Sequence, residues 1–247
     1  MSFSYEELAE IRHYIHQHPE LSGQEYQTTA FLKERLEELG IRILESRLKT
    51  GLIAEIGSGQ PVVALRADID ALPILEQTNL PYQSQNPGVM HACGHDFHQT
   101  SLLGAAALLK EKEDQLEGTV RLIFQAAEEI SEGASDVLAT GLLEDVQGII
   151  GFHNIPQLKA GQLALNAGAM MAGVEKFKVT VTGVSSHAAR PDLGVDTVTA
   201  VTTMVQNVQL LISRTVSPFE TAVLSITHLD VGSTWNVLPK SGYFEGT

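Results

Sequence analysis

Apolar residues recur at helical spacing at the start of the chain. Leu8, Ile11 and Ile15 lie three or four residues apart, which places them on one face of a helix. A second segment, residues 26–39, repeats the pattern, and Gly40 follows it where a helix C-terminus favours glycine. The pattern therefore predicts two amphipathic helices in this part of the protein.

Short apolar runs then alternate with helical segments. Helices are predicted near residues 98–112 and 134–139. Runs that lie between glycine, proline or polar positions predict four strands, at residues 52–56, 62–67, 120–126 and 148–152. This alternation is typical of an α/β fold, so we expect a mixed, largely parallel sheet covered by helices on both faces.

The pattern changes near residue 172. Residues 176–182 alternate between apolar and polar side chains, which predicts a half-exposed strand. A helix and two further strands are predicted after it, at residues 195–213, 222–229 and 242–244. We therefore expect a first domain of residues 1–171 and a smaller α+β domain of residues 172–247. Because the chain stops directly after a predicted strand, we expect the second domain to be incomplete.

Charge and cysteine content exclude several classes of protein. The 30 acidic residues outnumber the 16 basic ones, and no basic cluster is present that could bind nucleic-acid phosphates. No apolar run approaches the roughly 18 residues of a membrane span, and residues 1–7 are acidic, unlike a secretory signal. The single cysteine, Cys93, allows no intrachain disulfide. We expect a cytoplasmic protein.

Ionisable side chains follow three of the predicted strands. Asp68 and Asp70 follow the second strand, Glu128 and Glu129 the third, and His153 the fourth. Ligands of open α/β sheets bind beside the carboxyl ends of the strands, so we expect these groups to converge. Carboxylates that converge repel one another unless a cation compensates them. The arrangement favours a cation site.

The segment between the second and third of these strands contains Cys93, Gly94 and His95. The thiol and the imidazole are two residues apart, and the intervening glycine allows the close turn that would aim both at one ion. Cysteine, histidine and carboxylate together suit zinc or a related transition metal. A core cysteine beside helix-capping residues is the structural alternative. We interpret His91 and His98, which flank this segment, as supporting or capping groups.

The adjacent residues Glu128 and Glu129 suggest two different roles for neighbouring carboxylates. Successive side chains near a strand end point in different directions. One carboxylate can therefore bind metal while the other takes a proton from water, which is how metalloenzymes commonly hydrolyse amides. Two other functions stay open on this reasoning: an amidase with Cys93 as nucleophile and His95 or another histidine as base, and a metal-binding or interaction module without catalysis.

Six motifs follow one another along the chain. They are His16-Gln-His-Pro-Glu-Leu-Ser22, Arg66-Ala-Asp-Ile-Asp-Ala-Leu-Pro73, His91-Ala-Cys-Gly-His-Asp-Phe-His98, Ala127-Glu-Glu129, Gly151-Phe-His153 and Ser186-His-Ala-Ala-Arg-Pro191. Together and in this order they resemble one family of enzymes, the dinuclear metallo-aminoacylases, which include hippurate hydrolases, N-acetyldiaminopimelate deacetylases and auxin-conjugate hydrolases and are distantly similar to carboxypeptidase G.

The resemblance implies metal-dependent hydrolysis of the amide bond of N-acyl amino acids. It implies that Cys93, His95, Glu129 and His153 bind two divalent ions, of zinc, manganese, nickel or cobalt, and that Glu128 is the general base. Family members have a longer chain, whose later part supplies a last histidine ligand. For the 247 residues of this sequence we therefore expect incomplete binding of the metal pair.

The resemblance also implies roles around the metal pair. Asp70 resembles an aspartate that orients a metal-binding group. Asp68 stands where more distant relatives have a histidine ligand, so a ligand role does not transfer to it. In the second domain, His187 resembles a histidine that stabilises the oxyanion across a dimer, and Asn236 a residue that contacts substrate. We expect a homodimer formed through this domain, which would act as a lid.

Overall fold

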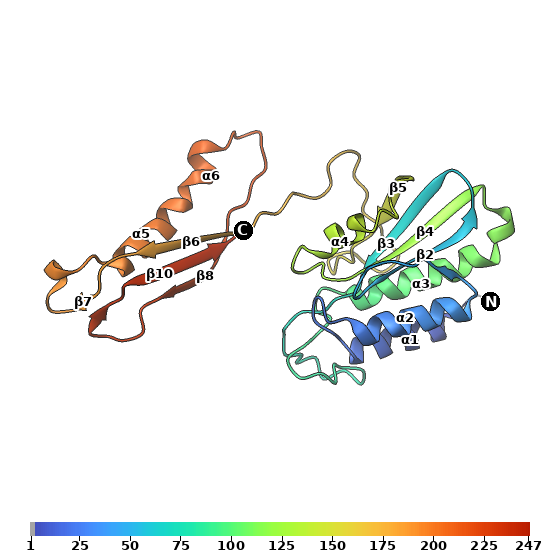
Figure 1. Ribbon diagram of the computed structural model, residues 1–247, viewed down its shortest axis with the longest axis horizontal. Helices are drawn as coiled ribbons and strands as arrows, with labels where there is room; N and C mark the ends of the chain where they lie inside the picture. The colour runs from blue at the N-terminus through green and yellow to red at the C-terminus, as the bar shows by residue number, and fades with distance from the viewer. Residues whose placement is uncertain (1–2) are drawn as a thin grey trace. The chain divides into compact units, whose positions relative to one another are not determined.

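The computed structural model describes residues 3–247 (Figure 1). Met1 and Ser2, where the acidic N-terminal segment begins, lie outside the described residues. The chain divides into two compact units, Met1–Gln162 and Leu163–Thr247. The division lies in the segment between the last strand of the first sheet and the first strand of the second, nine residues before the predicted boundary after residue 171.

A five-stranded sheet forms the centre of the first unit. Its order is β1-β2-β4-β3-β5. β3 pairs in parallel with β4 and β5, whereas β2 pairs antiparallel with β1 and β4, so the sheet is mixed and its parallel part is confined to the three strands around β3. The strands are β1 (Arg42–Ile43), β2 (Leu52–Ser58), β3 (Val62–Asp68), β4 (Gly118–Gln125) and β5 (Val146–Gly151).

Helices cover both faces of this sheet, but unequally. Three long helices pack on one face, and the short α4 lies against the other (Figure 1). A helical turn, η1 (Glu113–Gln115), leads into β4. The helices are α1 (Tyr5–Gln17), α2 (Tyr26–Glu38), α3 (His95–Glu111) and α4 (Gly133–Ala139). None of the helices in residues 3–247 combines the length and the apolar character that crossing a membrane requires.

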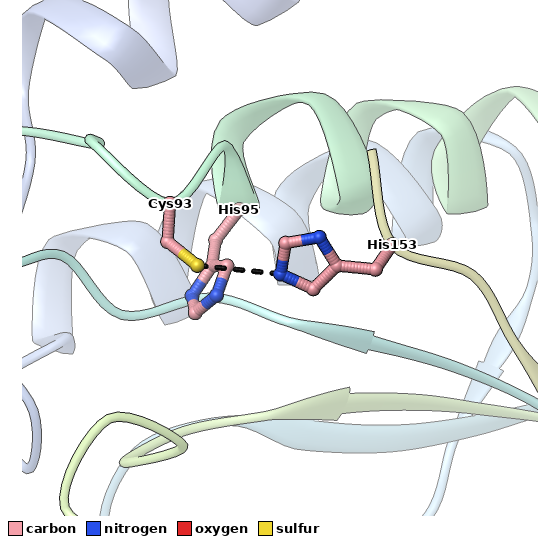
Figure 2. Close-up of side chains that lie close together, drawn as sticks. All are labelled: Cys93, His95 and His153. Atoms are coloured by element: carbon pink, nitrogen blue, oxygen red, sulfur yellow. Dashed lines mark hydrogen bonds between the residues drawn. The ribbon is translucent and has the colours of Figure 1, made fainter. Parts of the chain in front are cut away.

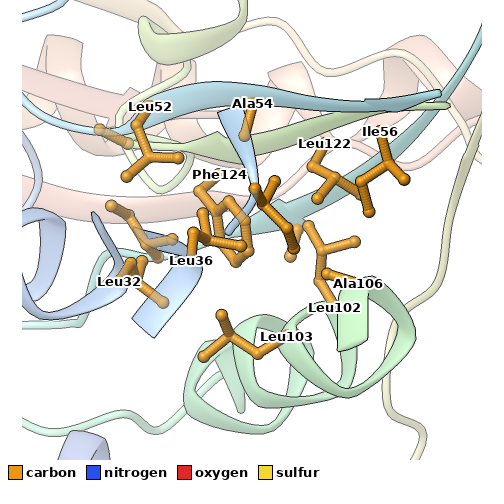
Figure 3. Close-up of a cluster of buried hydrophobic side chains, with 14 of the residues drawn as sticks. Leu32, Leu36, Leu52, Ala54, Ile56, Leu102, Leu103, Ala106, Leu122 and Phe124 are labelled. Atoms are coloured by element: carbon orange, nitrogen blue, oxygen red, sulfur yellow. The ribbon is translucent and has the colours of Figure 1, made fainter. Parts of the chain in front are cut away.

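Side chains alternate between the two faces of the sheet along each strand, and the apolar ones form a layer on each face. Leu122 and Phe124 of β4 face the long helices, where they meet Leu36 of α2 and Leu103 of α3 (Figure 3). Ile123 faces the opposite way, into a smaller cluster beneath α4. Burial of the apolar layer between the sheet and the long helices holds α3 against the sheet. The N-terminal end of α3 therefore lies close to the strand ends.

The helix α3 begins at His95, earlier than the predicted start near residue 98. Gly94 precedes it with φ 89°, a left-handed conformation that glycine adopts without a steric penalty. Asp96, in the first turn of α3, forms an ion pair with Arg12 Nε at 2.7 Å and a hydrogen bond with His16 Nδ1 at 2.8 Å, both of α1. These contacts fix α1 against the start of α3.

The second unit contains a three-stranded antiparallel sheet of order β6-β10-β8. The predicted helix of residues 195–213 is two helices divided at Gln209, and the predicted strand of residues 222–229 lies instead at Ile226–Val231. The elements are β6 (Phe177–Thr182), β7 (Ser186–His187), η2 (Pro191–Leu193), α5 (Thr197–Val208), α6 (Leu210–Thr215), β8 (Ile226–Val231), β9 (Val237–Leu238) and β10 (Ser241–Gly246).

Candidate metal centre

The carboxyl ends of β3, β4 and β5 lie at one edge of the sheet because these strands run in parallel. Asp68 is the last residue of β3, Glu128 follows β4 by a short turn, and His153 follows β5. The loop before α3 brings Cys93 and the start of α3 brings His95 to the same edge. The convergence predicted from the strand ends is therefore present.

Cys93, His95 and His153 point toward a common space (Figure 2). Cys93 Sγ lies 3.3 Å from His153 Nε2, and one donor atom from each of the three residues lies within 4.8 Å of the others. His153 Nδ1 lies 2.8 Å from the carbonyl oxygen of Asn154 and donates to it, which leaves the Nε2 lone pair directed at the thiol. Sulfur and two imidazole nitrogens are thus placed as ligands of one ion.

The two adjacent glutamates also lie close to His95. His95 Nε2 lies 3.8 Å from Glu129 Oε1 and 4.0 Å from Glu128 Oε2. The side chain of Glu129 is 19% exposed and that of Glu128 is 41% exposed. The inner carboxylate is thereby suited to bind a metal, and the outer one remains accessible to water and substrate.

Asp70 contacts both His95 and the backbone of Glu129. Its carboxylate accepts hydrogen bonds from the Glu129 N–H at 2.9 Å and from the Ser22 hydroxyl at 2.7 Å, and it lies 3.2 Å from His95 Nδ1. Burial would raise the pKa of Asp70, but its hydrogen bonds to His95, Glu129 and Ser22 lower it. Asp70 therefore stays ionised and directs His95 Nε2 into the site.

Two buried atoms in the cluster have no hydrogen-bond partner among the described residues. They are His95 Nε2 and Glu129 Oε1, which face one another. Leaving such atoms unsatisfied is costly unless something binds them. A cation between them would satisfy both, and a set of thiol, imidazole and carboxylate donors matches the preferences of zinc and similar ions. The residues therefore fit a metal.

The thiol of Cys93 points to the same conclusion. Burial and the nearby carboxylates of Glu129, Glu128 and Asp68 raise its pKa to about 12. A nucleophilic cysteine needs the opposite environment, one that lowers the pKa of the thiol. The closeness of Cys93 to His153 therefore does not favour the thiol-amidase alternative, whereas a cation would stabilise the thiolate as a ligand.

Asp68 bonds mainly to a side chain that is not among the predicted ligands. Its Oδ1 lies 2.6 Å from His98 Nδ1, and its other oxygen accepts a 2.7 Å hydrogen bond from Arg66. Burial opposes ionisation, but His98, His95 and Arg66 together lower the pKa of Asp68 to about 2. His98 follows His95 by three positions, so both lie on one face of α3.

Asn154 and Ser22 support the cluster through hydrogen bonds that the sequence alone does not indicate. Asn154 bonds His98, and Ser22 bonds Asp70. Ser22 belongs to one of the recognised motifs, but its partner lies 48 positions away. Asn154 directly follows a predicted ligand, which is the only signal that marks it in the sequence.

His187 and Asn236 lie together within the second unit. β7 pairs with β9, so His187 stands opposite Val237, and the Ala188 N–H donates to the carbonyl oxygen of Asn236 at 2.9 Å. The Ala189 N–H donates to His187 Nδ1 at 3.1 Å, which leaves Nε2 to carry the proton of the neutral ring. The exposed imidazole thus presents an N–H donor.

Comparison with known proteins identifies the family of the chain. The model of peptidase family M20/M25/M40 matches residues 64–231. An N-acetyl-L-cysteine deacetylase of Bacillus subtilis is 48% identical over 243 residues, and an IAA-amino acid hydrolase of Arabidopsis thaliana is 42% identical over 238 residues. The alignments cover 98% and 96% of this chain but 58% and 55% of those relatives.

A solved structure agrees with the sequence matches. It is that of a Bacillus subtilis protein described as a dinuclear metal-binding peptidase of the M20 family, with a TM-score of 0.77 and 44% identity. The match covers 97% of this chain and 62% of that one, so the chain spans about three-fifths of the relatives' length. The family model covers more than half of the chain, and the chain belongs to peptidase family M20/M25/M40.

Proposed function

We propose that the protein is a metal-dependent amidohydrolase that removes the acyl group from N-acyl amino acids with two divalent ions. The observation that carries this proposal is the grouping of Cys93, His95, Glu129 and His153, in which buried atoms of His95 and Glu129 face one another without a hydrogen-bond partner. The names of the deacetylase and amino acid hydrolase relatives support the substrate class.

Zinc, manganese, nickel or cobalt, when bound, would lower the pKa of water and polarise the amide carbonyl. Glu128 is suited to be the general base because its carboxylate is partly exposed and its Oε2 lies 4.0 Å from His95 Nε2. It would take a proton from the attacking water at a carboxylate oxygen and deliver it to the leaving nitrogen. Asp70 would keep His95 and the backbone of Glu129 in place during this transfer.

Within the second unit, we assign His187 to oxyanion stabilisation and Asn236 to substrate contact. The N–H that His187 presents and its position beside Asn236 support this assignment. We also propose a homodimer through residues 172–247, acting as a lid. Exposed apolar side chains of α5 and α6, such as Met204 and Leu210, are available for such contacts. A reducing, cytoplasmic location would keep the Cys93 thiol available as a ligand.

The test is the Glu128→Gln variant, assayed for hydrolysis of N-acetyl and N-benzoyl amino acids with and without added metal. Loss of the general base should lower kcat by about 10²- to 10⁴-fold. Metal content, measured by atomic absorption, should be unchanged because Glu128 is not among the proposed ligands. Glu132→Gln, an exposed glutamate in the same turn, is the matched control and should retain full activity.

Two results would contradict the proposal. Activity that survives complete chelation, and is abolished by iodoacetamide alone, would establish Cys93 as a nucleophile instead. Wild-type activity in the Glu128→Gln variant would show that the outer carboxylate is not the base.

A further inference from the structure

Asn154 connects the two segments that carry the proposed ligands. It directly follows His153, and its side-chain amide lies against Gly94, which stands between Cys93 and His95. A methyl group at Gly94 would lie 2.6 Å from Asn154 Nδ2 and 2.7 Å from its Cγ. The amide therefore occupies the space that a side chain at position 94 would need.

The same residue is tied to the buried face of α3. Asn154 Oδ1 lies 2.6 Å from His98 Nε2 and can accept a hydrogen bond from it, and the Asn154 backbone nitrogen lies 3.0 Å from the same ring nitrogen. His98 Nδ1 in turn bonds Asp68 at 2.6 Å, and both side chains are almost completely buried. A chain of hydrogen bonds thus runs from the end of β3 through α3 to the loop after β5.

Apolar contacts hold that loop only in part: Phe152 packs edge-on against Phe97 and His98 of α3, with ring centroids 5.7 and 5.2 Å apart. Ile149 and Ile150 of β5 are 57% and 68% exposed, and His153 is exposed. Within residues 3–247, the hydrogen bonds of the His153 ring go to Cys93 Sγ and to the carbonyl oxygen of Asn154. The polar contacts of residue 154 therefore contribute to the position of His153 relative to Cys93.

We propose that Asn154, anchored by His98 and Asp68, is a positioning residue that sets the distance between Cys93 and His153 and thereby the affinity for metal. The inference rests on the proposed metal centre and extends it. It also gives the carboxylate of Asp68 a role, as the anchor of His98. Groups that orient metal ligands commonly contribute about 10- to 100-fold to metal affinity.

The experiment is a titration of metal-free protein with Co²⁺, followed by the visible absorption of the ion and the sulfur-to-metal band of Cys93. Asn154→Ala should weaken binding by about 10- to 100-fold and alter the sulfur band. Gly94→Ala should act in the same direction, because the new methyl group displaces the amide and because φ 89° disfavours a side chain at this position. Asn86→Ala, which removes an asparagine amide bonded to the Pro19 carbonyl, is the control and should bind Co²⁺ normally.

A double-mutant cycle separates this role from a general loss of stability. His98→Ala should weaken Co²⁺ binding as Asn154→Ala does, and the double variant should be no weaker than either single variant because both changes break one network. His98→Gln, whose amide can reach the place of Nε2, should restore most of the affinity. Urea unfolding of the metal-free variants verifies that each is folded.

The His153→Ala variant distinguishes a failure of the positioning role from a failure of the metal centre. If His153→Ala loses Co²⁺ while Asn154→Ala and Gly94→Ala bind it as tightly as the wild type, the positioning role is wrong and the metal centre stands. If His153→Ala also binds Co²⁺ with unchanged affinity and spectrum, the metal centre itself is wrong, and the positioning role falls with it.

Discussion

At the scale of the residue, His95 shows how neighbouring carboxylates determine the chemistry of a buried side chain. Burial by itself would lower the pKa of this imidazole, because it disfavours the charged form. The hydrogen bond to Asp70 and the charges of Asp68, Asp70 and Glu129 outweigh that effect and raise the pKa. A cation that binds Nε2 takes the place of a proton that these carboxylates would otherwise retain.

Asp68→Asn tests the ion-pair network by its dependence on pH. The pKa of Asp68 is lowered to about 2, so its stabilising effect is fully present above the unfolded value of 3.8 and is lost as the pH falls toward 2. In metal-free protein, we expect this group to account for on the order of 1 kcal/mol of the stability lost between pH 5 and pH 3. Urea unfolding should show a correspondingly flatter pH dependence in Asp68→Asn. Parallel pH profiles for the two proteins would refute the assignment.

At the scale of the element, α3 links the core to the candidate site. Its first turn carries His95 and His98, and its middle buries Leu103 against the sheet. Because a helix is stiff, apolar packing in the middle of α3 also positions the side chains at its start. Gly94 ends the preceding loop in a conformation that permits this placement.

Leu103→Ala should therefore destabilise the first unit. The side chain is fully buried, and removing three carbons leaves a cavity that costs about 2–5 kcal/mol. Leu108→Ala is the matched control on the same helix, because Leu108 is 56% exposed and its truncation should cost well under 1 kcal/mol. The midpoints of urea unfolding measure both changes. Equal midpoints for the two variants would show that α3 is not held through this layer.

At the scale of the whole molecule, the proposed ligands all belong to the first of the two units. Cys93, His95, Glu129 and His153 lie within Met1–Gln162, whereas His187 and Asn236 belong to Leu163–Thr247. Metal binding without substrate should thus stabilise the two units to different extents. A ligand stabilises the part of a protein whose folded state it binds, by an amount that grows with its concentration above Kd.

Hydrogen exchange with and without Zn²⁺ measures that difference. At about 100 times Kd, zinc should slow exchange by up to roughly 100-fold in the segments around residues 91–98, 127–130 and 151–154. The amides of β6, β8 and β10 should exchange at unchanged rates. The same experiment on Cys93→Ala should show little protection anywhere. Protection confined to the second unit would place the metal elsewhere.

The local features of the chain were predictable because they depend on side chains close together in sequence. Apolar spacing indicated the long helices and the principal strands, and the chemistry of Cys93, His95 and Glu129 indicated a cation. Parallel pairing of β3 with β4 and β5 then required the groups after them to converge. The family followed from motifs, which are likewise short and local.

The tertiary structure decided what depends on contacts between distant segments. β4 lies between β2 and β3, which are consecutive in the chain, and no local pattern specifies that order. No local pattern specifies the division of the predicted helix at Gln209 either. The same holds for the hydrogen-bond partners of Asp68 and Asn154. Side-chain type and spacing are properties of the sequence itself, whereas a hydrogen-bond partner 56 positions away, such as His98 for Asn154, exists only once packing has brought the two segments together.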